Sequence, residues 1–108
     1  MKLIIDCGST KADWVVLNGK EVVLKFQTEG FNPNYTNKNT ILSIILDNTS
    51  YKAYIQEITE IYFYGTGCGN QENCNLVKGI LNSVFPNANI VVTHDLMAAC
   101  HALFGDKE

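Results

Sequence analysis

Short apolar runs interrupted by polar turns predict strands in the first quarter of the chain. Three segments are rich in Ile, Val, Trp and Phe, the residue types that favour strands: 2–6, 12–17 and 21–27. Asn18-Gly19, between the second and third segments, is a typical two-residue hairpin sequence. We therefore expect an antiparallel meander, followed by a loop over 28–34 because Gly30 and Pro33 disfavour regular structure there.

Apolar residues then recur at helical spacing in three later segments: 41–46, 70–84 and 95–104. Two short apolar strands separate these helices, at 58–64 and 90–92. Asn37 or Thr36 is available to cap the first helix, whose pattern breaks at 47–50. Pro86 ends the second helix, because proline cannot continue the backbone hydrogen bonding.

The resulting element order is β-β-β-α-β-α-β-α, which predicts an α/β fold. The first three strands pair antiparallel, whereas strands joined through helices pair in parallel, so we expect a mixed five-stranded sheet. Helices should cover both faces, as in the ribonuclease H-like fold. No repeat or linker divides the sequence, and we treat 1–108 as one domain.

The amino-acid composition argues against nucleic acid and membranes as binding partners. Eight Lys plus Arg against eleven Asp plus Glu give a net charge of -3, so no basic excess favours nucleic acid or an acidic membrane surface. The apolar run at residues 3–5 is far too short for a secretion signal or a membrane span, and we expect a cytoplasmic protein. We expect the four cysteines to be thiols that act as small buried apolar residues, and Cys68 and Cys74 form only a weak zinc motif.

The first candidate site follows the first strand, at Asp6-Cys7-Gly8-Ser9-Thr10-Lys11. Gly8 allows close backbone approach, Ser9 and Thr10 supply hydroxyls, Lys11 supplies a positive charge, and Asp6 can hold hydrated Mg²⁺. Together these groups suit a phosphate, although the Walker motif GxxxxGK[ST] is absent. An ordinary hairpin turn also favours Asp, Gly and Ser, and this interpretation stays open.

The second candidate is the glycine-rich segment 65–70, between a predicted strand and a predicted helix. Backbone amides at such a turn can face an anion, and we assign Gly65 and Gly67 to substrate binding. A dinucleotide-binding GxGxxG motif is not completed, because Asn70 stands where the third glycine belongs. A tight strand-to-helix turn without a ligand is the alternative.

Two further candidates lie in loops. Asp95 follows the last strand, where a carboxylate could accept the proton of a substrate hydroxyl during phosphoryl transfer. The same residue is a favourable helix N-cap, and the two roles compete for its oxygens. Asn34, in the loop after the third strand, suits sugar hydroxyl and amide groups, but Asx turns also explain asparagine there.

These segments together resemble the N-acetylglucosamine kinase and BadF/BadG-type ATPase family, within the superfamily of sugar kinases, actin and heat-shock chaperones. The resemblance rests on four motifs in the family's order: residues 3–14, Gly30-Phe31-Asn32-Pro33, residues 62–67 and residues 93–99. It implies that Asp6 organises Mg²⁺ and that Gly8, Ser9, Thr10 and Lys11 bind phosphate of ATP. It further implies that Asn34 faces the sugar and that Asp95 is the general base.

Family members continue into a second lobe that carries the adenosine pocket, so we expect residues 1–108 to be an amino-terminal lobe that is inactive alone. The expected full-length function is ATP-dependent phosphorylation of an amino sugar such as N-acetylglucosamine. One alternative is a BadF/BadG-type activator that couples ATP hydrolysis to electron transfer. Another is a non-catalytic module that binds a sugar or a protein partner; a homodimer is one such partner that the sequence leaves open.

Overall fold

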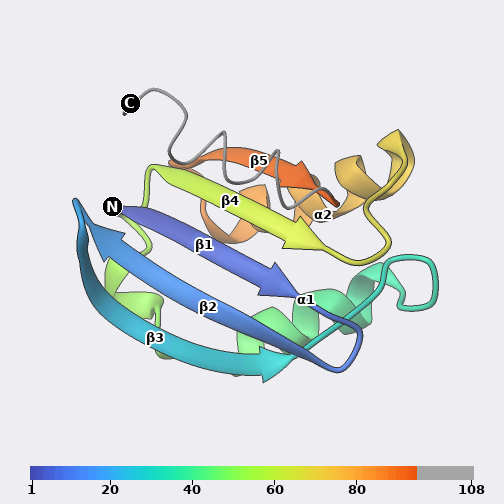
Figure 1. The fold of residues 1–108 in the computed structure, drawn as a ribbon, viewed down its shortest axis with the longest axis horizontal. Helices are drawn as coiled ribbons and strands as arrows, with labels where there is room; N and C mark the ends of the chain where they lie inside the picture. Colours follow the sequence, from blue (N-terminus) through green and yellow to red (C-terminus); the bar gives the residue numbers. More distant parts are fainter. Residues whose placement is uncertain (95–108) are drawn as a thin grey trace.

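A five-stranded sheet with two helices packed against one face makes up residues 1–94, which the computed structural model describes (Figure 1). Its strands are β1 (Lys2–Cys7), β2 (Lys11–Asn18), β3 (Glu21–Glu29), β4 (Glu60–Gly65) and β5 (Asn89–Thr93). Their order is β3-β2-β1-β4-β5, with β1 antiparallel to β2, β2 antiparallel to β3, and β4 parallel to both β1 and β5. The predicted α/β fold with a mixed five-stranded sheet is confirmed.

Alternation along the strands decides which face the helices cover. Leu3, Ile5 and Cys7 of β1 are buried, whereas Asp6 between them is exposed on the opposite face. The same alternation buries Ala12, Trp14 and Val16 of β2 and Ile61 and Phe63 of β4. Because side chains of a strand alternate between faces, these apolar residues form one continuous layer against the helices.

The two helices are α1 (Lys38–Asp47) and α2 (Gln71–Val84), and each begins at an asparagine cap. The Asn37 side chain accepts from the Thr40 amide over 2.9 Å, so Asn37 rather than Thr36 caps α1. Asn70 caps α2 through the Asn73 amide, at 2.8 Å. Both helices lie behind the sheet in Figure 1. The third predicted helix, 95–104, lies outside the described residues, and helices on both faces therefore stay a prediction.

Stacked aromatic rings fill the space between the sheet and the helices. The Trp14 ring stacks on Phe26 and on Tyr51, with centroids 5.2 and 5.8 Å apart. Tyr51 precedes a 3-10 helix, η1 (Lys52–Tyr54), that the sequence pattern does not predict, and its hydroxyl donates to the Ile45 carbonyl over 2.8 Å. Tyr51 also contacts Phe85, after α2. These rings join the meander to both helices.

Several element boundaries differ from the predicted ones. β3 continues to Glu29 rather than ending at residue 27, because Thr28 pairs with Ala12 and Glu29 pairs with Lys11 of β2. The loop therefore begins at Gly30. The two loop residues of the β2–β3 hairpin are 19 and 20 rather than 18 and 19, since a bulge near Val16 shifts the pairing. β4 begins at Glu60 rather than at residue 58.

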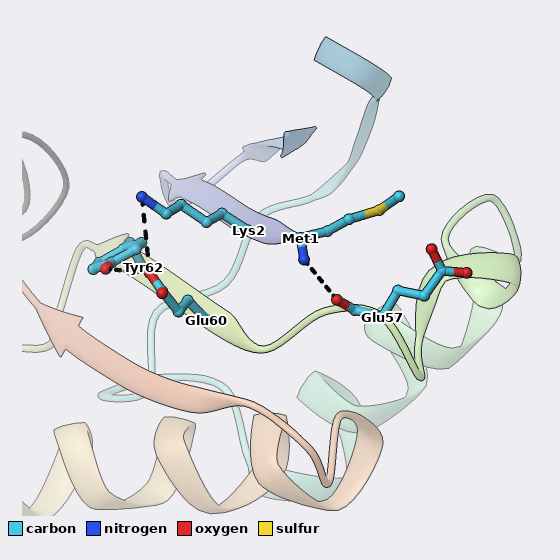
Figure 2. A network of polar contacts seen from close by, with 5 residues as sticks. All are labelled: Met1, Lys2, Glu57, Glu60 and Tyr62. Carbon is cyan, nitrogen blue, oxygen red and sulfur yellow. Dashed lines mark hydrogen bonds and ion pairs between the residues drawn. The ribbon is translucent and has the colours of Figure 1, made fainter. Parts of the chain in front are cut away.

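A network of polar contacts lies at the edge of the sheet where the parallel strands β1 and β4 begin (Figure 2). The Met1 ammonium donates to the Glu57 carbonyl over 2.7 Å, and Lys2 pairs with Glu60 at 3.9 Å. The Tyr62 hydroxyl donates to the Glu60 carboxylate over 2.8 Å, and burial together with this carboxylate raises the pKa of Tyr62 to about 12. The Lys2–Glu60 ion pair is partly exposed to solvent, and such a pair contributes at most about 1 kcal/mol. Within residues 1–94, no helix is long and apolar enough to cross a membrane.

Candidate functional site

The candidate site lies at the opposite edge of the sheet, where the three parallel strands end (Figure 1). In the strand register Asp6 of β1 is the partner of Tyr64 of β4, and Tyr64 is the partner of Thr93 of β5. Adjacent strands are about 4.8 Å apart, so Asp6 and Thr93 stand roughly 10 Å from each other across the sheet. In open α/β sheets this edge is where ligands bind.

Residues 8–11, the β1–β2 loop, bring together the predicted phosphate-binding residues. The Gly8 amide donates to the Lys11 carbonyl over 2.9 Å and holds the loop closed. A hollow of about 270 Å³ opens beside it, lined by Asp6, Gly8, Ser9, Thr10, Lys11 and Asp13. Larger hollows of about 370 and 670 Å³ lie elsewhere and contain none of the predicted site residues. The five residues predicted for Mg²⁺ and phosphate thus line one small hollow.

Asp13 also lines this hollow and was not among the predicted site residues. It stands opposite Asp6 in the antiparallel pair of β1 and β2, so both carboxylates are on one face of the sheet. Gln27 of β3 donates to the Asp13 carboxylate over 2.7 Å. Like charges directly opposite each other are unfavourable in a sheet, and a cation in the hollow would relieve that repulsion.

Residues 30–34, the asparagine loop, pack directly on the β1–β2 loop. The Gly30 amide donates to the Thr10 carbonyl over 2.9 Å. A Cβ at position 30 would collide with the Gly8 carbonyl oxygen and the Lys11 amide nitrogen, so this contact requires glycine. The Cys7 thiol lies 3.5 Å from the Phe31 carbonyl oxygen below the contact. The two loops consequently hold each other in place.

Residues 65–70, the glycine turn, pack on the other side of the asparagine loop. Gly67 has a φ of 86°, and a Cβ there would collide with the side-chain oxygen of Asn32. The Thr66 amide donates to the Cys7 carbonyl over 3.1 Å, which ties the turn to the end of β1. Gly65 is buried at the end of β4, where a Cβ would collide with the Phe63 ring. Of the two glycines predicted to bind substrate, Gly65 is therefore the last residue of β4, whereas Gly67 lies beyond the strand.

Asn34 and Asn73 connect the asparagine loop to the first turn of α2. Asn73 is only 9% exposed, and its side-chain amide nitrogen donates to Asn34 Oδ1 over 2.8 Å and to the Gly67 carbonyl over 2.7 Å. The backbone N–H of Asn34 also donates to Asn32 Oδ1 over 2.9 Å in an Asx turn. Asn34 remains exposed, so its side chain is both anchored and accessible.

Three thiols lie under these loops. Cys7 and Cys68 are each 1% exposed, and Cys74 lies 3.2 Å from the Cys68 carbonyl oxygen. Burial is the main cause that raises the pKa of Cys7 to about 11 and that of Cys68 to about 12. Neutral thiols are poor nucleophiles and poor metal ligands. Within residues 1–94, no group of three or more His, Cys, Asp or Glu side chains could hold a metal ion. The prediction of buried thiols is confirmed for Cys7 and Cys68.

Asp95, the predicted general base, lies outside the described residues. The structure places its neighbour His94 just beyond the end of β5, where a methyl group on Gly69 would be 3.9 Å from the His94 ring. The chain therefore reaches position 94 beside the glycine turn, at the edge of the sheet that also carries Asp6.

Comparisons with known proteins find a solved structure that resembles this chain. No family model matches the sequence, and a search of the curated proteins finds no significant match. The crystal structure of a protein from Porphyromonas gingivalis, described as a "putative N-acetylglucosamine kinase", matches with a TM-score of 0.82 and 33% sequence identity. The match covers 98% of this chain and 38% of the P. gingivalis protein.

The fold is ribonuclease H-like. This ribonuclease H-like chain shares its architecture with the P. gingivalis protein over almost its whole length, while it spans 38% of the length of that protein. Sequence reasoning found the three loops of the site but missed Asn73 and Asp13. For Asn73 a signal was present: residues 73, 77, 80 and 81 form the buried stripe of α2, so an asparagine on that stripe had to have buried partners.

Proposed function

We propose that the chain is the amino-terminal lobe of an ATP-dependent sugar kinase that transfers the γ-phosphate to an amino sugar such as N-acetylglucosamine. The observation that carries the proposal is the packing of the β1–β2 loop, the asparagine loop and the glycine turn against one another at one edge of the sheet. The likeness to the P. gingivalis protein supports it, because 33% identity accompanies the shared fold.

The hollow at the β1–β2 loop is lined by oxygen atoms of the kind that coordinate Mg²⁺ and by a lysine and hydroxyl groups that suit phosphate. Asp6 offers a carboxylate, and Ser9 and Thr10 offer hydroxyls, which are hard oxygen ligands of the kind Mg²⁺ prefers. In the proposed reaction Asp6 would hold Mg²⁺ through its water shell, and Lys11 would neutralise charge on the phosphates. When bound, Mg²⁺ supplies further neutralisation of the charge that develops on the transferred group.

The sugar would lie between Asn34 and the position of Asp95. In this proposal Asp95 accepts the proton of a sugar hydroxyl while the hydroxyl oxygen forms a bond to the γ-phosphorus. The bond between that phosphorus and the bridging oxygen of ADP breaks, and ADP leaves. Asn34, Gly65 and Gly67 would orient the sugar for in-line attack. Positioning and charge neutralisation together supply most of the rate enhancement in such reactions.

Replacement of Asp95 by Asn tests the proposal in the protein that contains this lobe. Because Asn caps a helix as well as Asp does, Asp95→Asn removes the base and leaves any capping intact. We expect kcat to fall about 10²-fold or more with little change in sugar affinity. Asp47→Asn, with the same charge change on α1, is the control and should keep wild-type turnover. An Asp95→Asn enzyme with normal kcat would leave Asp95 as a cap only and would contradict the proposed mechanism.

A further inference from the structure

The Gly67 carbonyl fixes the orientation of two side-chain amides. A carbonyl oxygen can only accept a hydrogen bond, so the Asn73 atom that lies 2.7 Å from it must be the NH₂ group. The same NH₂ group lies 2.8 Å from the side chain of Asn34, and it can only donate. The Asn34 atom that faces Asn73 must therefore be its oxygen. This orientation follows from the donor and acceptor inventory alone.

The consequence concerns the accessible half of Asn34. With Oδ1 engaged by Asn73, the NH₂ group of Asn34 points away from Asn73, and Asn34 is an exposed residue of the asparagine loop. An asparagine that is free to rotate can offer a donor or an acceptor to a ligand. Asn34, held in this way, presents its NH₂ group as the donor on the side away from Asn73, so the group that it recognises on that side must be an acceptor oxygen.

We propose that Asn73 is a positioning residue: its buried amide, held by the Gly67 carbonyl, fixes Asn34 so that Asn34 donates to an acceptor oxygen of the sugar. This proposal rests on the proposed sugar kinase function. It adds that, in the contact between Asn34 and the sugar, Asn34 donates the hydrogen bond and the sugar accepts it. A sugar hydroxyl oxygen or an acetamido carbonyl oxygen satisfies it, whereas a group that only donates is rejected. A buried polar group left unpaired is costly, which makes such a site selective.

Asn73→Asp reverses the polarity of the contact at constant shape. A carboxylate cannot donate to the Gly67 carbonyl or to Asn34 Oδ1, so the Asn34 amide would turn and present its oxygen to the sugar. In the protein that contains this lobe, with N-acetylglucosamine and ATP as substrates, we expect the KM for the sugar to rise about tenfold. We expect kcat to change by less than about threefold, because the reacting groups are untouched.

Asn75→Asp is a matched control on the same helix. Asn75 is exposed and accepts from Gln71 through its side-chain oxygen over 2.9 Å, so an aspartate there keeps that hydrogen bond and adds the same charge. Its sugar KM should stay within about twofold of wild type. Thermal unfolding of both variants reports whether α2 is intact. If Asn73→Asp does not fold, Asn34→Asp at the exposed position is the second variant, because it removes the donor and keeps the acceptor.

A double-mutant cycle that combines Asn73→Asp with Asn34→Ala distinguishes a positioning role of Asn73 from a purely structural one. If Asn73 acts through Asn34, Asn73→Asp in the Asn34→Ala background should change the sugar KM by less than about twofold. A tenfold effect in both backgrounds would mean that Asn73 acts through Gly67 or the fold, and would overturn the proposal. An unchanged KM in Asn34→Asp would overturn it as well. A wild-type protein that binds no amino sugar would instead overturn the proposed function, and the role of Asn34 with it.

Discussion

The backbone amide of Gly30 donates to the Thr10 carbonyl over 2.9 Å, and this hydrogen bond joins the asparagine loop to the β1–β2 loop. The two backbones are so close that position 30 has no room for a Cβ. Because one loop is proposed to bind phosphate and the other to bind sugar, their contact fixes the distance between the two reacting groups. Small displacements of reacting groups lower the rates of such reactions strongly.

Gly30→Ala should therefore impair both stability and turnover. The new methyl group collides with the Gly8 carbonyl and the Lys11 amide, and backbone atoms cannot move aside as a flexible side chain can. We expect the free energy of unfolding to fall by about 1–3 kcal/mol, as in other overpacked sites. We expect kcat/KM for ATP to fall at least about tenfold. Urea unfolding followed by Trp14 fluorescence and steady-state kinetics measure the two effects.

Gly79→Ala is the matched control for that substitution. Gly79 lies within α2, where a Cβ would meet no atom within 4 Å, and alanine favours a helix over glycine by about 1 kcal/mol. The same change of residue should thus stabilise the protein at position 79 and leave turnover unaltered. Equal effects at positions 30 and 79 would contradict the close packing of the two loops.

The buried thiols predict a loss of stability at alkaline pH. The pKa of Cys7 is raised from 9.0 to about 11 and that of Cys68 from 9.0 to about 12, chiefly by burial. Below pH 9 the thiols are protonated in both the folded and the unfolded chain. Above it the unfolded chain loses protons that the folded chain keeps. Each thiol then lowers the free energy of unfolding by about 1.4 kcal/mol per pH unit until its folded pKa is reached.

Urea unfolding at pH 7 to 10.5 measures this slope. The double variant Cys7→Ala, Cys68→Ala should be less stable at pH 7, because each substitution leaves a cavity, but its stability should fall less steeply above pH 9. Parallel slopes for the wild type and the double variant would show that these thiols do not account for the alkaline loss.

The sheet could be predicted from the sequence because its signal is local. Runs rich in Ile, Val, Trp and Phe predicted the first three strands, and within β1, β2 and β4 the structure buries an apolar residue at every second position. The contribution of Tyr51 to the core could not be predicted, since residues 47–55 have no apolar periodicity. Tyr51 is buried only because Trp14, Phe26 and Phe85 meet there from distant parts of the chain.

The loops of the site could be identified by residue type, but their contacts could not. Glycine and asparagine at positions 30, 34 and 67 indicated turns and polar ligands equally well. What distinguishes these interpretations is the contact between loops: Gly30 against Thr10, Gly67 against Asn32 and Asn73 against Asn34. Such contacts join residues up to 39 positions apart, and they depend on the register of β1 with β4 rather than on any local pattern.

Direct detection of the phosphorylated sugar tests the central claim. The protein that contains this lobe is incubated with ATP, Mg²⁺ and N-acetylglucosamine, and the products are analysed by mass spectrometry, with residues 1–108 alone in a parallel reaction. We expect one phosphorylated sugar for each ADP formed, ADP formation that depends on the sugar, and no turnover by residues 1–108 alone. ADP formation that is independent of the sugar, with no phosphorylated sugar produced, would contradict the assignment as a sugar kinase.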